Sequence, residues 1–272
     1  MVYSSLIVVS FFALPHSDFN YYIILTYAMP IFCAKIRKMS RLLRLHFKRN
    51  VFVDSDGLLL YNPIILDVLW RSAMNRKPYS SAIKKTPFKY TIAKKMAKLM
   101  LDGLDRVDVY NECFNNNYIE IESAERRREI TNVLYARLSV LDSFLLSQFY
   151  SGDVATSKFI LAYSIAKTDT LFFDFLAEVY REALLGDKHY LSMDDFDNFF
   201  ATKKQSDLIV AQWGDFTLQC LTKGYRNILV DSGLGSRDRR TIRVERMMIH
   251  PAVEEHIAEI GDKEYLQIML GR

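Results

Sequence analysis

The stretch DFTLQCLTKGYRNILVDSGLGSRDRRTIRVERMMI, residues 215–249, decides the fold of the C-terminal part of the chain. Apolar residues recur through its first half at the spacing of a helix face: Leu218, Leu221, Tyr225, Ile228 and Leu229. Gly233 and Gly235 follow and are typical of a helix end. Beyond them, Ile242 and Val244 alternate with polar residues, which predicts a strand. The stretch therefore predicts a helix followed by a short β-hairpin.

Two helical segments precede this stretch. Ser192 begins the segment SMDDFDNFFATKK, with Asp195 three residues later, which is the pattern of a capping box. A short second helix is predicted over SDLIVAQW, and a break at Trp213–Gly214 separates it from the longer helix. Three helices followed by a hairpin are the order of a winged helix, whose wing lies along a phosphate backbone. We therefore predict a winged-helix-like C-terminal domain over residues 187–272.

The predicted hairpin is rich in arginine. SRDRRTIRVER, residues 236–246, holds five arginines in eleven residues. A charged surface turn accounts for such a run, and so does a set of bidentate phosphate clamps. Polar residues on the outside of the preceding helix extend the second interpretation. Together they form the candidate DNA-binding set of this domain: Thr217, Lys223, Arg226, Arg237, Arg239, Arg240 and Arg243.

A second candidate reader lies upstream, in a predicted helical domain over residues 86–186. Residues 90–142 predict a helix, a short helix, a turn and a longer helix, which is the order of a helix-turn-helix. The first turns of the longer helix carry polar residues that can reach bases or phosphates: Arg126, Arg127, Arg128 and Asn132. The same helix is predicted to continue as one apolar stripe: Ile130, Leu134, Leu138, Leu141 and Leu145. Three-helix bundles that bind no DNA share this pattern, so that alternative stays open.

The central segment, residues 153–186, is predicted to be helical, with its aromatic residues in the core. Asp174 and Glu178 are predicted on its solvent-exposed side. Residues 76–88, RKPYSSAIKKTPF, contain two prolines and predict a linker. They belong to a basic zone, residues 35–98, that is either a solvated face or a surface for phosphate.

The first 34 residues are apolar and differ from the rest of the chain. Only Asp18 is charged, and prolines interrupt two apolar stretches that are each shorter than the roughly 20 residues of a membrane-spanning helix. The basic residues that follow are nevertheless typical of a cytoplasmic exit from a membrane. Three interpretations of residues 1–85 stay open: inner-membrane association through residues 1–34, an apolar extension packed on the body of the protein, and a start placed too far upstream of Met39 or Met74.

Composition excludes several classes of protein. Hydrophobic residues make up 50% of the 272 positions and charged residues 25%, so the chain is neither disordered nor fibrous. Its three cysteines lie far apart without CxxC spacing, which excludes a disulfide framework and a zinc finger and indicates a reducing, cytoplasmic setting. No histidine pair has metal-ligand spacing, and no glycine motif for phosphate binding is present. We expect no enzyme activity, no metal and no cofactor.

The order of several segments resembles the BrxA family of the BREX (bacteriophage exclusion) defence systems. FKYTIAKKMAKLMLDGL comes first, FFDFLAEVYREALLGD is followed by LSMDDFDNFFATK and AQWGDFTLQCLTKGYRNILVDSGL, and IHPAVEEHIAEIGDKEYLQIMLG comes last. The resemblance runs from about Tyr90 to Arg272. It implies an all-helical, DNA-binding protein with helix-turn-helix elements that works beside a methyltransferase and other BREX subunits. The same family has been catalogued as an inner-membrane protein.

Taken together, the residues and the resemblance predict an all-α, multi-helix protein with two helix-turn-helix-like modules, the second of them winged. Such a protein is expected to bind double-stranded DNA and to perform no chemistry itself. A protein of another class, a scaffold, would also account for the basic zones. Such a scaffold would dock other defence subunits. In one version it would do so at the inner membrane, where its cations meet anionic headgroups.

Overall fold

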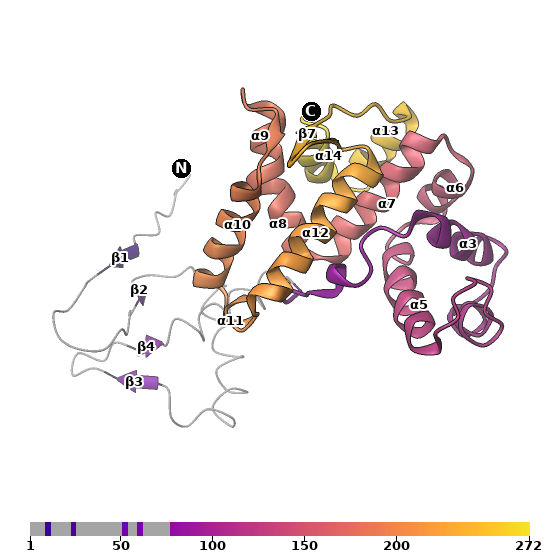
Figure 1. Cartoon of the computed structure of the whole chain (residues 1–272), viewed down its shortest axis with the longest axis horizontal. Coiled ribbons are helices and arrows are strands. Elements are labelled where there is room, and N and C mark those ends of the chain that lie inside the picture. Colours follow the sequence, from indigo (N-terminus) through magenta and orange to yellow (C-terminus); the bar gives the residue numbers. More distant parts are fainter. Residues whose placement is uncertain (1–8, 12–22, 26–50, 54–58, 62–76) are drawn as a thin grey trace, which may run out of the picture. The chain divides into compact units, whose positions relative to one another are not determined.

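A computed structural model gives the structure of the chain (Figure 1). It describes residues 77–272 and, upstream of them, only the backbone of four short strands. These strands are β1 (Val9–Phe11), β2 (Ile23–Leu25), β3 (Val51–Val53) and β4 (Leu59–Tyr61). They pair antiparallel in the order β1-β2-β4-β3. The chain divides into two compact units, Met1–Arg76 and Lys77–Arg272.

The prediction of an all-α fold holds for most of the second unit, which is mostly helical but also contains one small three-stranded antiparallel sheet. The expectations for residues 1–34, membrane association among them, lie outside the described residues apart from the two strands β1 and β2. No helix in the part of the chain that the structure describes combines the length and apolar character needed to cross a bilayer.

The first helices of the second unit follow the predicted order. They are α3 (Tyr90–Leu101), α4 (Arg106–Tyr110), its continuation η2 (Asn111–Asn115) and α5 (Ala124–Leu138). Asp105 accepts hydrogen bonds from the backbone of Val107 and Asp108 and so fixes the start of α4. The single long helix predicted through Leu145 is wrong. A new helix, α6 (Ser143–Ser151), begins because the Asp142 carboxylate accepts a hydrogen bond from the Leu145 amide.

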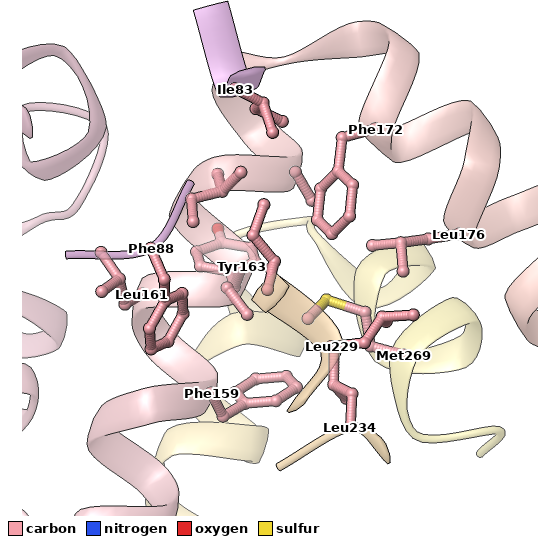
Figure 2. Packing of buried hydrophobic residues seen from close by; sticks show 14 of the residues in the cluster. Ile83, Phe88, Phe159, Leu161, Tyr163, Phe172, Leu176, Leu229, Leu234 and Met269 are labelled. Atoms are coloured by element: carbon pink, nitrogen blue, oxygen red, sulfur yellow. The ribbon is translucent and has the colours of Figure 1, made fainter. Parts of the chain in front are cut away.

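The central helices form the core. They are α7 (Val154–Thr168), α8 (Thr170–Phe175), η3 (Leu176–Tyr180) and α9 (Arg181–Leu185). Ten of the eleven positions from Thr156 to Ala166 in α7 are buried, because other helices cover α7 on several sides. Figure 2 shows side chains from segments far apart in the sequence in one cluster, with Phe159, Phe172 and Leu229 among them. The aromatic residues of the central segment are core residues, as predicted.

The C-terminal part contains the predicted helices and hairpin. Its elements are β5 (Tyr190–Leu191), α10 (Met193–Ser206), α11 (Leu208–Ala211), α12 (Asp215–Ser232), β6 (Gly235–Asp238), β7 (Thr241–Val244), α13 (Pro251–Glu259) and α14 (Lys263–Met269). Ser192 and Asp195 form the predicted capping box. Gly233, with φ of 87°, ends α12 in the left-handed conformation that glycine favours. The strands pair in the order β5-β7-β6, so a strand before α10 completes a sheet with the hairpin.

The segment predicted as a linker is instead packed against the body. It forms a short 3-10 helix, η1 (Ala82–Lys84), and its apolar residues Tyr79, Ile83 and Phe88 are buried. Ile83 lies directly against α12 at Gly224, where a Cβ would approach the Ile83 Cγ2 atom to 2.8 Å. A glycine in the middle of a helix usually lowers the stability of that helix. Here the close approach of Ile83 explains why α12 has glycine at this position.

Two charged side chains, Asp174 and Arg137, are buried, and Asp174 contradicts the prediction that it lies on the solvent-exposed side of its helix. Asp174 is only 5% exposed, because the Tyr79 hydroxyl donates a hydrogen bond to it (2.6 Å) and the Lys203 ammonium lies 3.6 Å away. Arg137 in α5 is 3% exposed and donates hydrogen bonds to the carbonyl oxygens of Thr86 and Pro87. Both contacts hold the segment before α3 in place. The pattern of polar and apolar residues in the sequence does not reveal these contacts.

Candidate nucleic-acid interface

The hairpin β6–β7 follows α12 after two residues and projects an arginine tip. Four residue pairs form its register, from Gly235↔Val244 to Asp238↔Thr241, so Arg239 and Arg240 make the turn. Arg239 has a φ of 51°, the left-handed region that tight turns require. At the base of the hairpin, a Cβ on Gly235 would approach the Arg243 carbonyl oxygen to 2.8 Å. The two strands therefore meet closely there, and both tip arginines are exposed.

The remaining arginines of the hairpin lie on different faces of the sheet, because successive side chains of a strand point to opposite faces. Arg237 is paired with Ile242, which is fully buried, so Arg237 lies at the edge of the inner face. Arg243 is paired with Ser236 on one side and Tyr190 on the other, and all three are exposed on the outer face. Arg243 is thus not part of the surface that Arg237 shares with α12.

Arg237 joins the basic side of α12. Its Nη2 atom donates a hydrogen bond to Asn227 Oδ1 (2.8 Å). Partial burial and then the nearby charge of Arg237 lower the pKa of Arg226, so two guanidinium groups lie within each other's field. Lys223 is exposed one helical turn before Arg226 and Asn227.

We call Lys223, Arg226 and Arg237 the α12–wing cluster. Among the described residues, none of these three side chains forms an ion pair, nor does Arg239, Arg240 or Arg243. Arg226 does contact the sulfur atom of Met193, which fixes its position beside the start of α10. Three cations close together without a carboxylate partner form a site of positive potential that suits an anion.

Thr217 does not belong to this cluster. It is half-buried in the first turn of α12, nine residues before Arg226. At roughly 100° per residue, nine residues place two side chains on opposite sides of a helix. Next to Thr217, the apolar ring of Phe216 is instead exposed, at 78%. Sequence patterns did not indicate that this ring is exposed, because an aromatic residue at a helix start is usually part of the core.

The arginines of α5 are mostly used within the protein. Arg126 pairs with Glu129 (2.7 Å) and donates to the Lys85 carbonyl oxygen. Arg127 donates to the carbonyl oxygens of Ile121 (2.6 Å) and Glu122. Arg127 therefore stabilises the turn before α5, and Arg126 connects the first turn of α5 to the segment before α3. Arg128 is exposed and stacks over Phe114 at 5.1 Å.

Asn132 is exposed one turn after Arg128, at the edge of a cavity of about 380 Å³. The walls of this cavity come from α4 and α5: Arg106, Tyr110, Thr131, Asn132, Tyr135, Ala136 and Ser139. Arg106, Tyr110 and Tyr135 were not singled out by the sequence. Sequence patterns did not point to this group, because Tyr135 is 25 positions from Tyr110 and 29 positions from Arg106. Only the turn between the two helices brings these residues together.

Comparison with known proteins identifies the family. The BrxA family model matches residues 77–261. A protein of Bacillus cereus (strain H3081.97), described as BREX protein BrxA, is 34% identical over 193 residues, which are 71% of this chain and 96% of that protein. The chain belongs to the BrxA family. The family match covers most of the mostly helical unit, from the packed segment before α3 to the end of α13, and includes both the α12–wing cluster and the cavity beside α5.

The BrxA fold also occurs in a solved structure. The crystal structure of an uncharacterized protein from Magnetospirillum magneticum superposes with a TM-score of 0.63 at 19% identity, over 71% of this chain and 99% of that one. This likeness concerns the fold alone. The fold that the two chains share makes up nearly all of that other chain.

Proposed function

We propose that this BrxA protein is a DNA-binding component of a BREX-type phage-defence system. The α12–wing cluster is the observation that carries the proposal. Lys223, Arg226 and Arg237 converge from a helix and a hairpin without a carboxylate partner, and the exposed tip arginines extend the same basic edge. Guanidinium groups suit phosphate because they donate two parallel hydrogen bonds.

In this proposal, β5, α10, α11, α12 and the hairpin act as a winged helix. The sheet order β5-β7-β6 supports this assignment, because the strand before α10 anchors the hairpin beside α12. The wing then lies along the sugar-phosphate backbone, and phosphate contacts fix the register of the protein on the duplex. Arg243, on the outer face, contributes less than Arg237.

The helices α3, α4 and α5 supply a second contact. Arg128 and Asn132 are exposed on the same side of α5, and no carboxylate in the described part of the chain forms an ion pair with Arg128. Arg127 supports this contact indirectly, since it holds the turn before α5, and Arg126 does so by connecting α5 to the segment before α3. Other BREX subunits, a methyltransferase among them, are the proposed protein partners.

The proposed role is binding without chemistry of its own. Histidines are the usual general bases, and the side chains of two described histidines have structural contacts. His250 Nδ1 accepts a hydrogen bond from the Ala252 amide at the start of α13. His256 Nε2 lies 2.6 Å from Asp142 Oδ2 and joins α13 to the start of α6. Within the described residues, no group of three potential metal ligands is present.

Salt dependence tests the proposal. Fluorescence anisotropy of a labelled short duplex would be measured over a series of salt concentrations with the full chain. Because each phosphate contact releases counterions, log K is expected to fall with log salt with a slope of about −0.9 per contact. Removing Arg237 is expected to reduce the slope by about one. A salt-independent affinity, or none for duplex DNA, would contradict the proposal.

A scaffold is the second candidate, and one observation favours it. Phe216, Leu208 and Ile209 are exposed at the junction of α11 and α12, at 78%, 43% and 40%. Exposed apolar residues that adjoin one another often mark a protein-binding surface. Binding of the full chain to anionic vesicles and to purified BREX subunits, but not to duplex DNA, would select the scaffold. Phe216→Ser would then abolish subunit binding and leave vesicle binding unchanged.

A further inference from the structure

The cavity beside α5 has the dimensions of a small-molecule site. Its volume is about 380 Å³, within the roughly 300–1,000 Å³ of ligand pockets. Arg106 and Tyr110 of α4 form one wall, and Thr131, Asn132 and Tyr135 of α5 form the other.

Three polar groups of the cavity wall make no hydrogen bond to any residue that the structure describes. The Thr131 hydroxyl is buried and makes no hydrogen bond. The Asn132 amide is exposed and makes none, and Arg106 forms neither a hydrogen bond nor an ion pair. A buried hydroxyl without a partner is costly, so such a group in a native protein calls for an explanation.

Two aromatic rings complete the wall. The Arg106 guanidinium lies over the Tyr135 ring, 5.8 Å from its centroid. Tyr110 stacks on Phe114 with centroids 5.3 Å apart and is therefore held in a fixed orientation. Flat rings, a guanidinium and a side-chain amide in one small cavity match a planar ligand with hydrogen-bonding edges better than an aliphatic or purely anionic one.

We propose that this cavity binds an unstacked purine base. An asparagine amide pairs with adenine at its N6 and N7 atoms, and Asn132 is placed to do so while Tyr110 or Tyr135 stacks on the base. Arg106, at the mouth of the cavity, then neutralises the attached phosphate. The base comes either from a nucleotide displaced from duplex DNA, which rests on the proposed function, or from a free nucleotide, which does not.

The experiment uses the full chain and three labelled short duplexes of matched sequence: fully paired, with one bulged adenine, and with one bulged thymine. Affinities are measured by anisotropy, and binding of free dAMP by calorimetry. The variants are Asn132→Ala and Tyr135→Leu, with Asn115→Ala as the matched control. Asn115 is an exposed asparagine of η2 that does not line the cavity.

The expected result is that the bulged adenine binds at least about fivefold more tightly than the paired duplex. Asn132→Ala and Tyr135→Leu remove this preference, whereas Asn115→Ala keeps it. Binding of dAMP without any bulge preference would identify the free nucleotide as the ligand. Equal affinities for all duplexes together with no dAMP binding would overturn the inference. If no duplex binds at all, the proposed function fails, and the dAMP measurement alone decides on the cavity.

Discussion

Arg237 on the hairpin donates a hydrogen bond to Asn227 on α12, with 2.8 Å between Nη2 and Oδ1. This contact connects the two elements on which the α12–wing cluster is built. It holds the guanidinium of Arg237 close enough to Arg226 for the charge of one to lower the pKa of the other. Repulsion between two cations costs stability, and a bound phosphate between them would relieve it.

Asn227 is therefore a positioning residue. Asn227→Ala is expected to weaken duplex binding by about threefold to fivefold, because Arg237 keeps its charge but loses its orientation. Arg237→Ala is expected to weaken duplex binding more, since it removes the positive charge as well as its orientation. Anisotropy titrations at one salt concentration compare the two variants. A larger loss in Asn227→Ala than in Arg237→Ala would show that Asn227 acts in another way.

Gly235 tests the hairpin itself. Gly235→Ala places a Cβ 2.7 Å from Ile242 Cγ2 and 2.8 Å from the Arg243 carbonyl oxygen, and the backbone oxygen cannot yield cheaply. We expect a loss of about 1–3 kcal/mol in the free energy of unfolding, measured by urea denaturation. The neighbouring Ser236→Ala, at an exposed position, is the control and is expected to cost less than 1 kcal/mol. Equal stabilities would mean that the strands separate more easily than the structure indicates.

The buried Arg137 is expected to matter for stability and not for DNA. Arg137→Met removes two hydrogen bonds to the carbonyl oxygens of Thr86 and Pro87 and leaves the buried Asp169 without its nearby cation. The expected loss in unfolding free energy is about 3–5 kcal/mol. Arg128→Met, on the exposed side of the same helix, should change it by less than about 0.5 kcal/mol. Similar losses in both variants would contradict the role given to burial.

Asp169 predicts a pH dependence. Burial raises the pKa of its carboxyl to about 6 from 3.8, although the Phe172 amide and Arg137 act in the opposite direction. Because the folded-state pKa is the higher one, the stability that the protonated carboxyl contributes is fully present below pH 3.8 and is lost as pH rises towards 6.

Asp169→Asn keeps an oxygen that can cap α8 but cannot titrate. Compared with this variant, the unmodified protein should therefore lose on the order of 3 kcal/mol of unfolding free energy between pH 3.8 and pH 6.5. Urea denaturation of both proteins across this range measures the difference. A constant difference would mean that Asp169 titrates at its ordinary pKa.

Local signals allowed much of this fold to be predicted. The caps Ser192 and Gly233 act over a few residues, and each starts or ends a helix where the sequence indicated. The break before α6 was missed, because the apolar spacing continues from Leu138 to Leu145 and hides the cap at Asp142. Periodicity alone does not show where one helix ends and a second begins in the same phase.

Contacts distant in sequence could not be predicted. Asp174 is buried because Tyr79, 95 positions away, donates a hydrogen bond to it. The separation of Arg237 and Arg243 depends on a register that the arginine run itself does not specify. The cavity beside α5 likewise exists only once α4 and α5 are placed together. The candidate residues were therefore found more readily than the surfaces they share.

The most direct test of the account is duplex affinity after removal of both arginines of the α12–wing cluster. Anisotropy titrations would compare the unmodified chain, Arg226→Ala/Arg237→Ala, and Arg181→Ala/Lys263→Ala, which removes the same charge from exposed positions on α9 and α14. The account predicts a loss of at least about tenfold, or 1.4 kcal/mol, for the first variant only. Equal affinities of the two variants would contradict it and leave the cluster as a solvated surface.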